Sequence, residues 1–193
     1  LASAPVIVFP QHPPPKATGP HSVARLVEHL TDASRVEKFS EDGRARQLVV
    51  EYWYPEASDS TFPLVVFSHG ATGVRSSNES LFQELASHGY VVASIDHPYH
   101  ALITTDAEGR TIGIDSGFLQ DLRNEDARKD PAGSLASYRA WMGLRMADLS
   151  FLIDYVRDST DAPGAARPFG LVDADRIGVM GHSLGGSAAV GVG

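Results

Sequence analysis

Short apolar runs separated by turn residues set the hydrophobic pattern of this chain. Alternating apolar and polar positions predict two strands, over residues 23–30 and 47–54, with an Asp-Gly turn within residues 41–44. Residues 64–67 and 90–95 are continuous apolar runs, which are typical of buried strands in a parallel sheet. We therefore expect an antiparallel pair of strands at the edge of a mostly parallel sheet.

Helical spacing of apolar residues predicts helices between these strands. The first helix follows a capping box, Ser76-x-x-Glu79, and ends at Gly89. Its apolar stripe consists of Leu81, Phe82 and Leu85. Further along, Glu108-Gly109 predicts a small hairpin, and the charged residues 121–131 predict a mobile or helical surface insertion.

A long helix follows this insertion. Its apolar positions recur at helical spacing and are Tyr138, Trp141, Met142, Leu149, Leu152, Ile153 and Val156. The charged positions outside that stripe are Arg139, Asp148, Asp154 and Arg157. After a Pro- and Gly-rich loop at residues 161–170, residues 176–180 predict another strand. Strands that alternate with helices predict an α/β fold with helices on both faces of the sheet.

Composition and charge narrow the function. The chain has 193 residues, of which 42% are hydrophobic, and this suits one soluble globular domain without a membrane span of ~18–20 apolar residues. The formal net charge is −8 and Lys and Arg are scattered, so we expect no nucleic-acid partner. The absence of cysteine excludes disulfides and thiolate metal sites. No acidic residue stands at ligand spacing with a His pair, so neither a metal nor another cofactor is expected.

The first residues form a separate segment in this interpretation. Residues 1–20 contain Pro13-Pro14-Pro15 and Gly19-Pro20, which predict an extended lead-in outside the core. Ala2-Ser3-Ala4 is similar to a signal-cleavage region, although no apolar signal core precedes it. We therefore favour secretion over a cytoplasmic location.

The chemistry is carried by Gly181-His182-Ser183-Leu184-Gly185, a G-x-S-x-G motif. The motif follows a buried strand and opens a helix at residues 187–190, which is the context of a nucleophile elbow. In such an elbow, Gly181 and Gly185 avoid collisions with the neighbouring strand and helix while the serine hydroxyl stands clear of the sheet. Ser183 is therefore the candidate nucleophile, and the alternative is a glycine-rich turn with an ordinary serine.

A second loop predicts an oxyanion hole. Residues 67–73 follow a strand and contain His69-Gly70, which is typical of the loop that donates an N–H group to a tetrahedral intermediate. Two donors are needed, and we expect them to be the backbone N–H groups of Ala71 and Leu184. The alternative is a tight turn that merely requires glycine.

Taken together, these motifs resemble the platelet-activating-factor acetylhydrolase family and its bacterial and fungal relatives. The matching segments are Gly19-Pro20-His21-Ser22-Val23, Trp53-Tyr54-Pro55, Phe67-Ser68-His69-Gly70, Leu85-Ala86-Ser87-His88-Gly89-Tyr90, Asp96-His97 and Gly181-His182-Ser183-Leu184-Gly185-Gly186. The resemblance implies an α/β-hydrolase fold and a calcium-independent serine esterase that cleaves short or oxidised acyl chains from phospholipid or small-molecule esters. It also implies Ser183 as the nucleophile and Ala71 and Leu184 as oxyanion donors. Ala71-Thr72-Gly73 departs from the family, where glycine directly follows the donor.

The acid and base of such an enzyme follow the nucleophile, in the order Asp or Glu and then His. Residues 184–193 contain none of these. We therefore expect residues 21–193 to be the N-terminal portion of a hydrolase domain without its last strands. The acid and base would come from the remainder of the same enzyme beyond Gly193.

Several alternatives stay open. An in-chain triad would draw on His69, His97, His100 or His182, with Asp96 as the acid. A polyester- or dienelactone-type hydrolase has the same fold, and a non-catalytic fragment or binding partner would keep the elbow without a base. Residues 101–103 and 117–119 would either line an apolar entrance or simply anchor loops.

Overall fold

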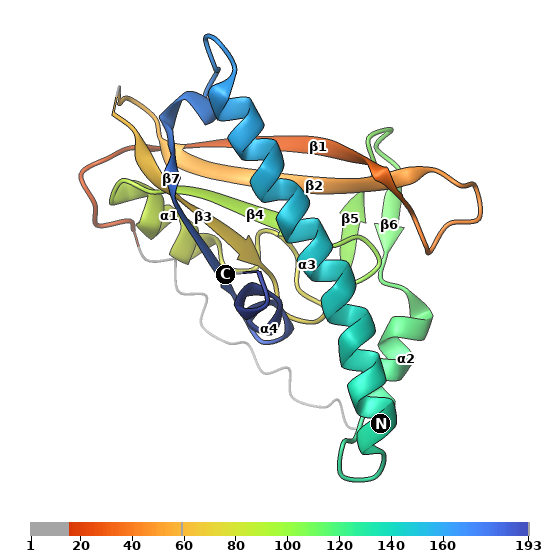
Figure 1. Ribbon diagram of the computed structural model, residues 1–193. Coiled ribbons are helices and arrows are strands. Elements are labelled where there is room, and N and C mark those ends of the chain that lie inside the picture. Colours follow the sequence, from red (N-terminus) through yellow and green to blue (C-terminus); the bar gives the residue numbers. More distant parts are fainter. Residues whose placement is uncertain (1–15, 59, 193) are drawn as a thin grey trace, which may run out of the picture.

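The computed structural model describes residues 16–58 and 60–192. Most of the expected lead-in, including Ala2-Ser3-Ala4, lies outside the described residues. The central feature is a five-stranded sheet in the order β1-β2-β4-β3-β7 (Figure 1). Its strands are β1 (Val23–Val36), β2 (Ala45–Pro55), β3 (Phe62–Ser68), β4 (Val91–Asp96) and β7 (Val172–Gly181). Strands β4, β3 and β7 are parallel, whereas β1, β2 and β4 are antiparallel neighbours, which confirms the predicted antiparallel edge.

Helices cover both faces of this sheet. The elements outside the sheet are α1 (Glu79–Ser87), β5 (Ile103–Thr105), β6 (Thr111–Gly113), α2 (Ser116–Asn124), α3 (Pro131–Asp161), the 3-10 helix Phe169–Leu171 and α4 (Leu184–Val190). Helices α3 and α4 lie on one face and α1 on the other, while α2 and the first half of α3 project beyond the sheet (Figure 1). Strands β5 and β6 form the hairpin expected around Gly109.

The core follows from the alternation of side chains along the strands. Val66 of β3 packs with Leu149 and Leu152 of α3, and its neighbour Phe67 points to the opposite face and packs with Phe82 of α1. The buried parallel strands therefore carry continuous apolar runs because both of their faces need partners.

The start of α1 differs from the prediction. The helix begins at Glu79 with Asn78 at its N-cap, and no side chain caps it, so the Ser76-x-x-Glu79 capping box is wrong. The hydroxyl of the next residue, Ser77, bonds to the turn before the helix, where its Oγ accepts the N–H of Val74. Gly89 does end the helix as expected, with a φ of 88° that favours glycine.

The long helix α3 is also longer than its apolar stripe. Asp130 caps it by accepting the N–H of Gly133 at 2.9 Å, so part of the charged insertion belongs to the helix start. The assignment of Asp148 to the polar positions is wrong, because its side chain is completely buried. Asp148 faces Arg35 at the end of β1, Arg46 at the start of β2 and His97 just after β4, and local spacing cannot reveal these partners.

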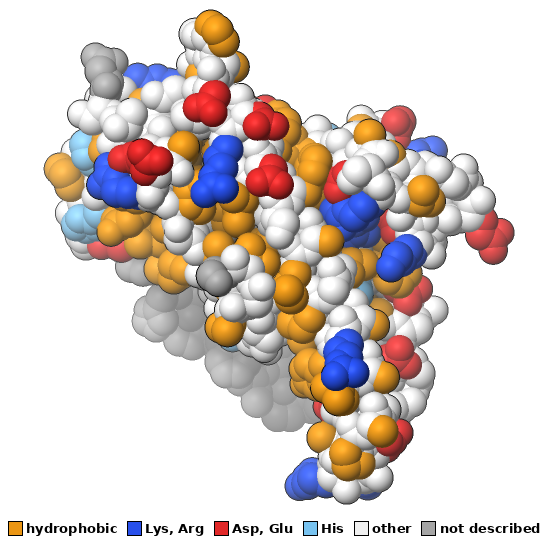
Figure 2. All heavy atoms as spheres, viewed as in Figure 1, with side chains coloured by type: hydrophobic (Ala, Val, Ile, Leu, Met, Phe, Trp, Pro, Cys, Tyr) orange, Lys and Arg blue, Asp and Glu red, His pale blue; other side chains and the backbone are white. Residues whose placement is uncertain are grey.

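Charge is spread over the surface. On the face seen in Figure 2, Lys and Arg side chains lie scattered among Asp and Glu side chains, in keeping with the net charge of −8. Among the described residues, no helix is both long and apolar enough to cross a membrane.

Candidate active site

Ser183 occupies the turn between β7 and α4. Its backbone has a φ of 51° and a ψ of −119°, a conformation that costs a non-glycine residue about 1–3 kcal/mol. The residue is exposed at the carboxyl end of a parallel strand, where ligands bind in open α/β sheets. The turn therefore presents the candidate nucleophile to solvent.

The two elbow glycines stand where a side chain would collide with backbone. A Cβ atom on Gly181 would lie 2.3 Å from the carbonyl carbon of Gly185. A Cβ on Gly185 would lie 2.0 Å from the carbonyl oxygen of Ser68 at the end of β3. The sharp turn thus requires glycine at both positions, and it brings the elbow against the end of β3.

The loop after β3 lies beside the elbow. The N–H of His182 donates to the carbonyl of Ser68 at 3.2 Å, which joins the two segments. Ala71 and Leu184 both pack against the small cluster of Phe118 and Trp141. Among the described residues, no backbone hydrogen bond uses the N–H of Ala71 or Leu184. The structure therefore places Ala71 and Leu184 against the same side-chain cluster, in two segments that a backbone hydrogen bond joins.

A different serine is hydrogen-bonded to a histidine. The Ser68 Oγ lies 2.8 Å from the His97 Nε2, and the His97 Nδ1 lies 2.9 Å from the Asp148 Oδ2. All three residues are completely buried, in β3, just after β4 and in α3. This Ser-His-Asp chain cannot be reached by a substrate, and His97 is not the base of Ser183.

Burial and neighbouring charges determine the protonation states of Asp148 and His97. Burial opposes the charge of Asp148, but Arg46 and the hydrogen bond from His97 outweigh it and hold the pKa of the carboxyl well below its usual range. Burial lowers the pKa of His97 far below 6.5, and the Arg145 guanidinium lowers it further. A neutral imidazole beside an ionised carboxylate must carry its proton on Nδ1, so the Ser68 hydroxyl donates to Nε2.

Two further histidines, His69 and His100, are also committed elsewhere. The His69 Nδ1 donates to the Gly70 carbonyl at 2.7 Å and its Nε2 accepts the His97 N–H at 3.2 Å, while burial lowers its pKa to about 4. His100 stacks on Phe118 with ring centroids 3.8 Å apart, and burial lowers its pKa to about 3. Among the hydrogen bonds of the described residues, none joins either histidine to Ser183.

Asp96, the possible acid of an in-chain triad, has a structural role. Its carboxylate accepts the N–H of Arg75 at 2.5 Å and the hydroxyl of Thr104 at 2.7 Å. It therefore ties the loop after β3 to the start of β5. No group of His, Asp or Glu in the described residues is arranged to hold a metal ion.

Arg145 is a charged residue of the site region that the sequence analysis missed. It lies in α3, completely buried, and its Nη1 donates to the carbonyl of His69 at 2.6 Å. Spacing carried a signal, because Arg145 and Asp148 continue the helical stripe between Trp141 and Leu152. Charged residues on an apolar stripe indicate a buried ion-pair network.

The two segments that were expected either to line an apolar entrance or to anchor loops have different surroundings. Gly117 and Phe118 line a cavity of about 310 Å³ that also borders Trp141. Leu102 has the anchoring role instead, since its N–H donates to the Gly73 carbonyl at 3.2 Å.

Comparisons with known proteins match this chain to acetylhydrolases and cutinases. A family profile described as platelet-activating factor acetylhydrolase, isoform II, matches residues 53–112. Platelet-activating factor acetylhydrolase of Canis lupus familiaris is 28% identical over 157 residues, covering 70% of this chain and 33% of that protein. Cutinase est2 of Thermobifida alba is 28% identical over 173 residues, covering 90% of this chain and 40% of that protein.

A solved structure of an esterase also resembles this chain. A ferulic acid esterase from Streptomyces cinnamoneus superposes with a TM-score of 0.68 at 31% identity, covering 92% of this chain and 56% of that one. The chain therefore spans between 33% and 56% of these three relatives. It is an α/β-hydrolase chain, similar to platelet-activating-factor acetylhydrolases and to bacterial cutinases and esterases.

Proposed function

We propose that this chain carries the nucleophile and the oxyanion hole of a serine hydrolase that cleaves carboxylic esters. The observation that carries the proposal is the exposed Ser183 at a φ of 51°, in a turn that is hydrogen-bonded to the end of β3, just before the loop that contains Ala71. The acetylhydrolase, cutinase and esterase relatives support the same reaction class.

The reaction proceeds through an acyl-enzyme. The Ser183 Oγ attacks the ester carbonyl carbon while its proton passes to a base, and the carbonyl oxygen becomes an oxyanion. The N–H groups of Ala71 and Leu184 stabilise this oxyanion. Collapse of the intermediate expels the alcohol, which takes the proton back from the base. Water then attacks the acyl-serine in the same way and releases the acid.

The base and its acid lie outside residues 1–193 in this proposal. His69, His97 and His100 are each held in buried contacts, and burial keeps each of them neutral. The His97–Asp148 pair has the chemistry of a base and its acid, but His97 is hydrogen-bonded to the buried Ser68. An Asp followed by a His, in the remainder of the same enzyme, would complete the site.

Two substrate classes compete within this reaction. An ester with a short acyl chain, including a phospholipid with an acetyl group, fits the acetylhydrolase relatives. A polyester is the second candidate, because the cutinase similarity covers 90% of this chain. Initial rates of the full-length polypeptide on an acetyl phospholipid and on a polyester film decide between the two classes.

The hydrolase proposal is tested by replacing Ser183 in the full-length polypeptide. Ser183→Ala removes the attacking oxygen and should lower the kcat for p-nitrophenyl acetate by about 10⁴–10⁶-fold, with an unchanged unfolding midpoint. Ser187→Ala is the control, since Ser187 is an exposed serine of α4 one helical turn away, and it should keep full activity. A wild type without ester hydrolysis would instead support a non-catalytic binding role, and full activity in Ser183→Ala would refute the nucleophile.

A further inference from the structure

Arg145 is a buried charge that the reaction itself does not use. Its side chain is completely buried in α3, and burial lowers the pKa of the guanidinium to about 10, so it remains protonated at neutral pH. A buried unpaired charge costs several kcal/mol, and the fold would keep it only with matched partners. The partners of Arg145 are therefore informative.

The strongest partner of Arg145 is a backbone carbonyl of the oxyanion loop. Its Nη1 donates to the carbonyl oxygen of His69 at 2.6 Å and lies 3.4 Å from the Ser68 Oγ. This carbonyl belongs to the peptide at which the chain leaves β3, two residues before Ala71. Fixing it restricts the rotation of the peptide planes that lead to the Ala71 N–H.

The same carbonyl touches the nucleophile elbow. A Cβ atom on Gly185 would lie 2.6 Å from the His69 carbonyl oxygen, so the elbow backbone packs directly on the group that Arg145 holds. One hydrogen bond from α3 thus acts at the contact between the loop that contains Ala71 and the turn that contains Ser183.

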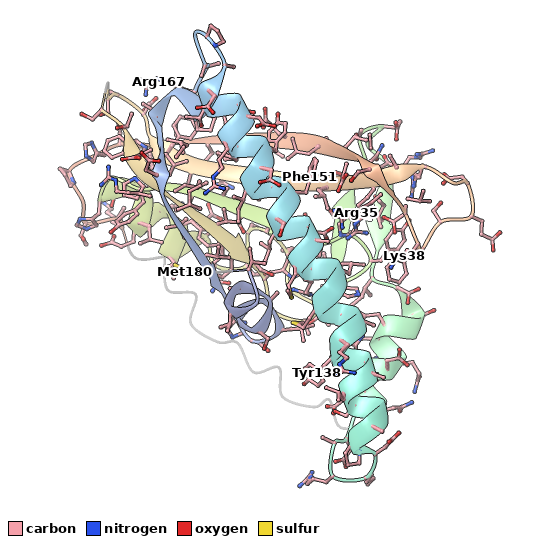
Figure 3. All side chains as sticks on the ribbon, viewed as in Figure 1. Arg35, Lys38, Tyr138, Phe151, Arg167 and Met180 are labelled. Atoms are coloured by element: carbon pink, nitrogen blue, oxygen red, sulfur yellow. The ribbon has the colours of Figure 1, made fainter. Side chains whose placement is uncertain are left out.

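The counter-charge of Arg145 is itself anchored from several strands. Asp148 lies one helical turn further along α3 and accepts hydrogen bonds from Arg46 at 2.7 Å and from His97 at 2.9 Å. Arg35 also pairs with Asp148 at 2.8 Å, from the end of β1 beside α3 (Figure 3). His97 also lies 2.8 Å from the Ser68 Oγ, so hydrogen bonds link Asp148 through His97 to Ser68, whose Oγ lies 3.4 Å from the Arg145 Nη1. The side chain of Arg145 therefore lies against groups that are themselves fixed by hydrogen bonds.

We propose that Arg145 is a positioning residue for the oxyanion hole. Its hydrogen bond to the His69 carbonyl holds the loop so that the Ala71 N–H faces the oxyanion formed at Ser183. This inference rests on the proposed ester hydrolysis. It predicts that the transition state, whose oxygen needs the donor, depends on Arg145, whereas ground-state binding of the ester does not.

The test uses Arg145→Met and Arg145→Lys in the full-length polypeptide, with Arg139→Met as the matched control on an exposed part of the same helix. For p-nitrophenyl acetate, Arg145→Met should lower kcat by about 10–10²-fold, less than the 10²–10³-fold for a whole lost donor, while KM stays within about twofold. The affinity for a trifluoromethyl ketone, which forms a tetrahedral adduct with the serine, should fall in parallel with kcat. Arg145→Lys keeps the charge and one donor, so its kcat should lie between those of Arg145→Met and wild type.

Amide hydrogen exchange adds a readout that does not depend on turnover. Exchange in a peptide spanning residues 69–73 should become faster in Arg145→Met, while peptides of β1 and β2 keep the wild-type rate. If Arg145→Met does not fold, Arg145→Lys decides the question alone. Wild-type kcat, inhibitor affinity and loop exchange in the folded variant would overturn the positioning role.

The two ideas fail in different ways. If the wild type shows no hydrolysis that depends on Ser183, the proposed function is wrong. If hydrolysis depends on Ser183 but Arg145→Lys or Arg145→Met changes kcat no more than Arg139→Met does, only the positioning role is wrong. A parallel rise in KM with an unchanged kcat would also overturn it, because the effect would then lie in substrate binding.

Discussion

Two glycines allow Ser183 to stand where it does, and both were identified from the motif alone. Gly181 and Gly185 each face backbone atoms at distances that leave no room for a methyl group. The strand–turn–helix context of Ser183 could be predicted because the motif combines a buried strand, two glycines and a small-residue helix within a short segment. The commitment of Ser68 to His97 could not, since those two residues lie 29 positions apart.

Gly185→Ala tests this packing at the residue scale. The new methyl group would meet the Ser68 carbonyl oxygen at 2.0 Å, so the elbow or β3 must shift, at a cost of about 1–3 kcal/mol in unfolding free energy. Gly178→Ala in β7 is the matched control, because a Cβ there meets nothing within 4 Å, and its stability should change by less than about 0.5 kcal/mol. Urea unfolding compares the two. Equal stability of both variants would show that the elbow can accommodate a methyl group at residue 185.

At the scale of the elements, helix α3 contains both positions whose burial local spacing predicts and one whose burial it does not. Its apolar stripe correctly placed Trp141, Leu149 and Leu152 in the core. Asp148 was misplaced because its partner Arg46 lies 102 positions earlier in the sequence. Helical periodicity identifies which positions share a face, but the partner that neutralises a buried charge depends on how distant strands are brought together.

Asp148→Asn is the prediction that belongs to this helix. It leaves Arg46 and Arg145 buried with less compensation, so the unfolding free energy should fall by about 3–5 kcal/mol. Asp154→Asn, at an exposed position of the same helix, should change it by less than about 0.5 kcal/mol. Thermal or urea unfolding of both variants provides the measurement. A small loss in Asp148→Asn would mean that the buried network contributes little to stability.

For the whole molecule, the antiparallel edge and the parallel centre of the sheet were predictable, and the strand order was not. The apolar runs and the Asp-Gly turn are local features, whereas the order β4-β3-β7 arises from crossover connections. The sequence analysis also named His69, His97 and His100 as candidates for an in-chain triad. It could not reveal that all three are buried and neutral, because burial depends on the helices packed above them.

These histidines make stability depend on pH. The pKa of His69 is about 4 and that of His100 about 3 in the folded protein, against about 6.5 in an unfolded chain, so the unfolded state binds protons first as the pH falls. Stability should be fully present above pH ~6.5 and decline towards pH 4, by up to about 1.4 kcal/mol per pH unit for each histidine. Melting temperatures between pH 7.5 and 4.5 measure the decline.

Two variants assign this pH dependence. His100→Gln should make the decline shallower, whereas His88→Gln, at a half-exposed position of the surface, should leave it unchanged. A melting temperature that is constant from pH 7.5 to 4.5 in the wild type would contradict the burial of neutral histidines.

The central claim is that Ser183 is the nucleophile, and covalent labelling tests it most directly. The full-length polypeptide is treated with a fluorophosphonate, digested, and the modified residue is located by mass spectrometry. A single adduct on Ser183 is predicted, with Ser68 unmodified despite its histidine partner, because that hydroxyl is buried. An adduct on Ser68 or Ser187 with Ser183 unlabelled would contradict the account.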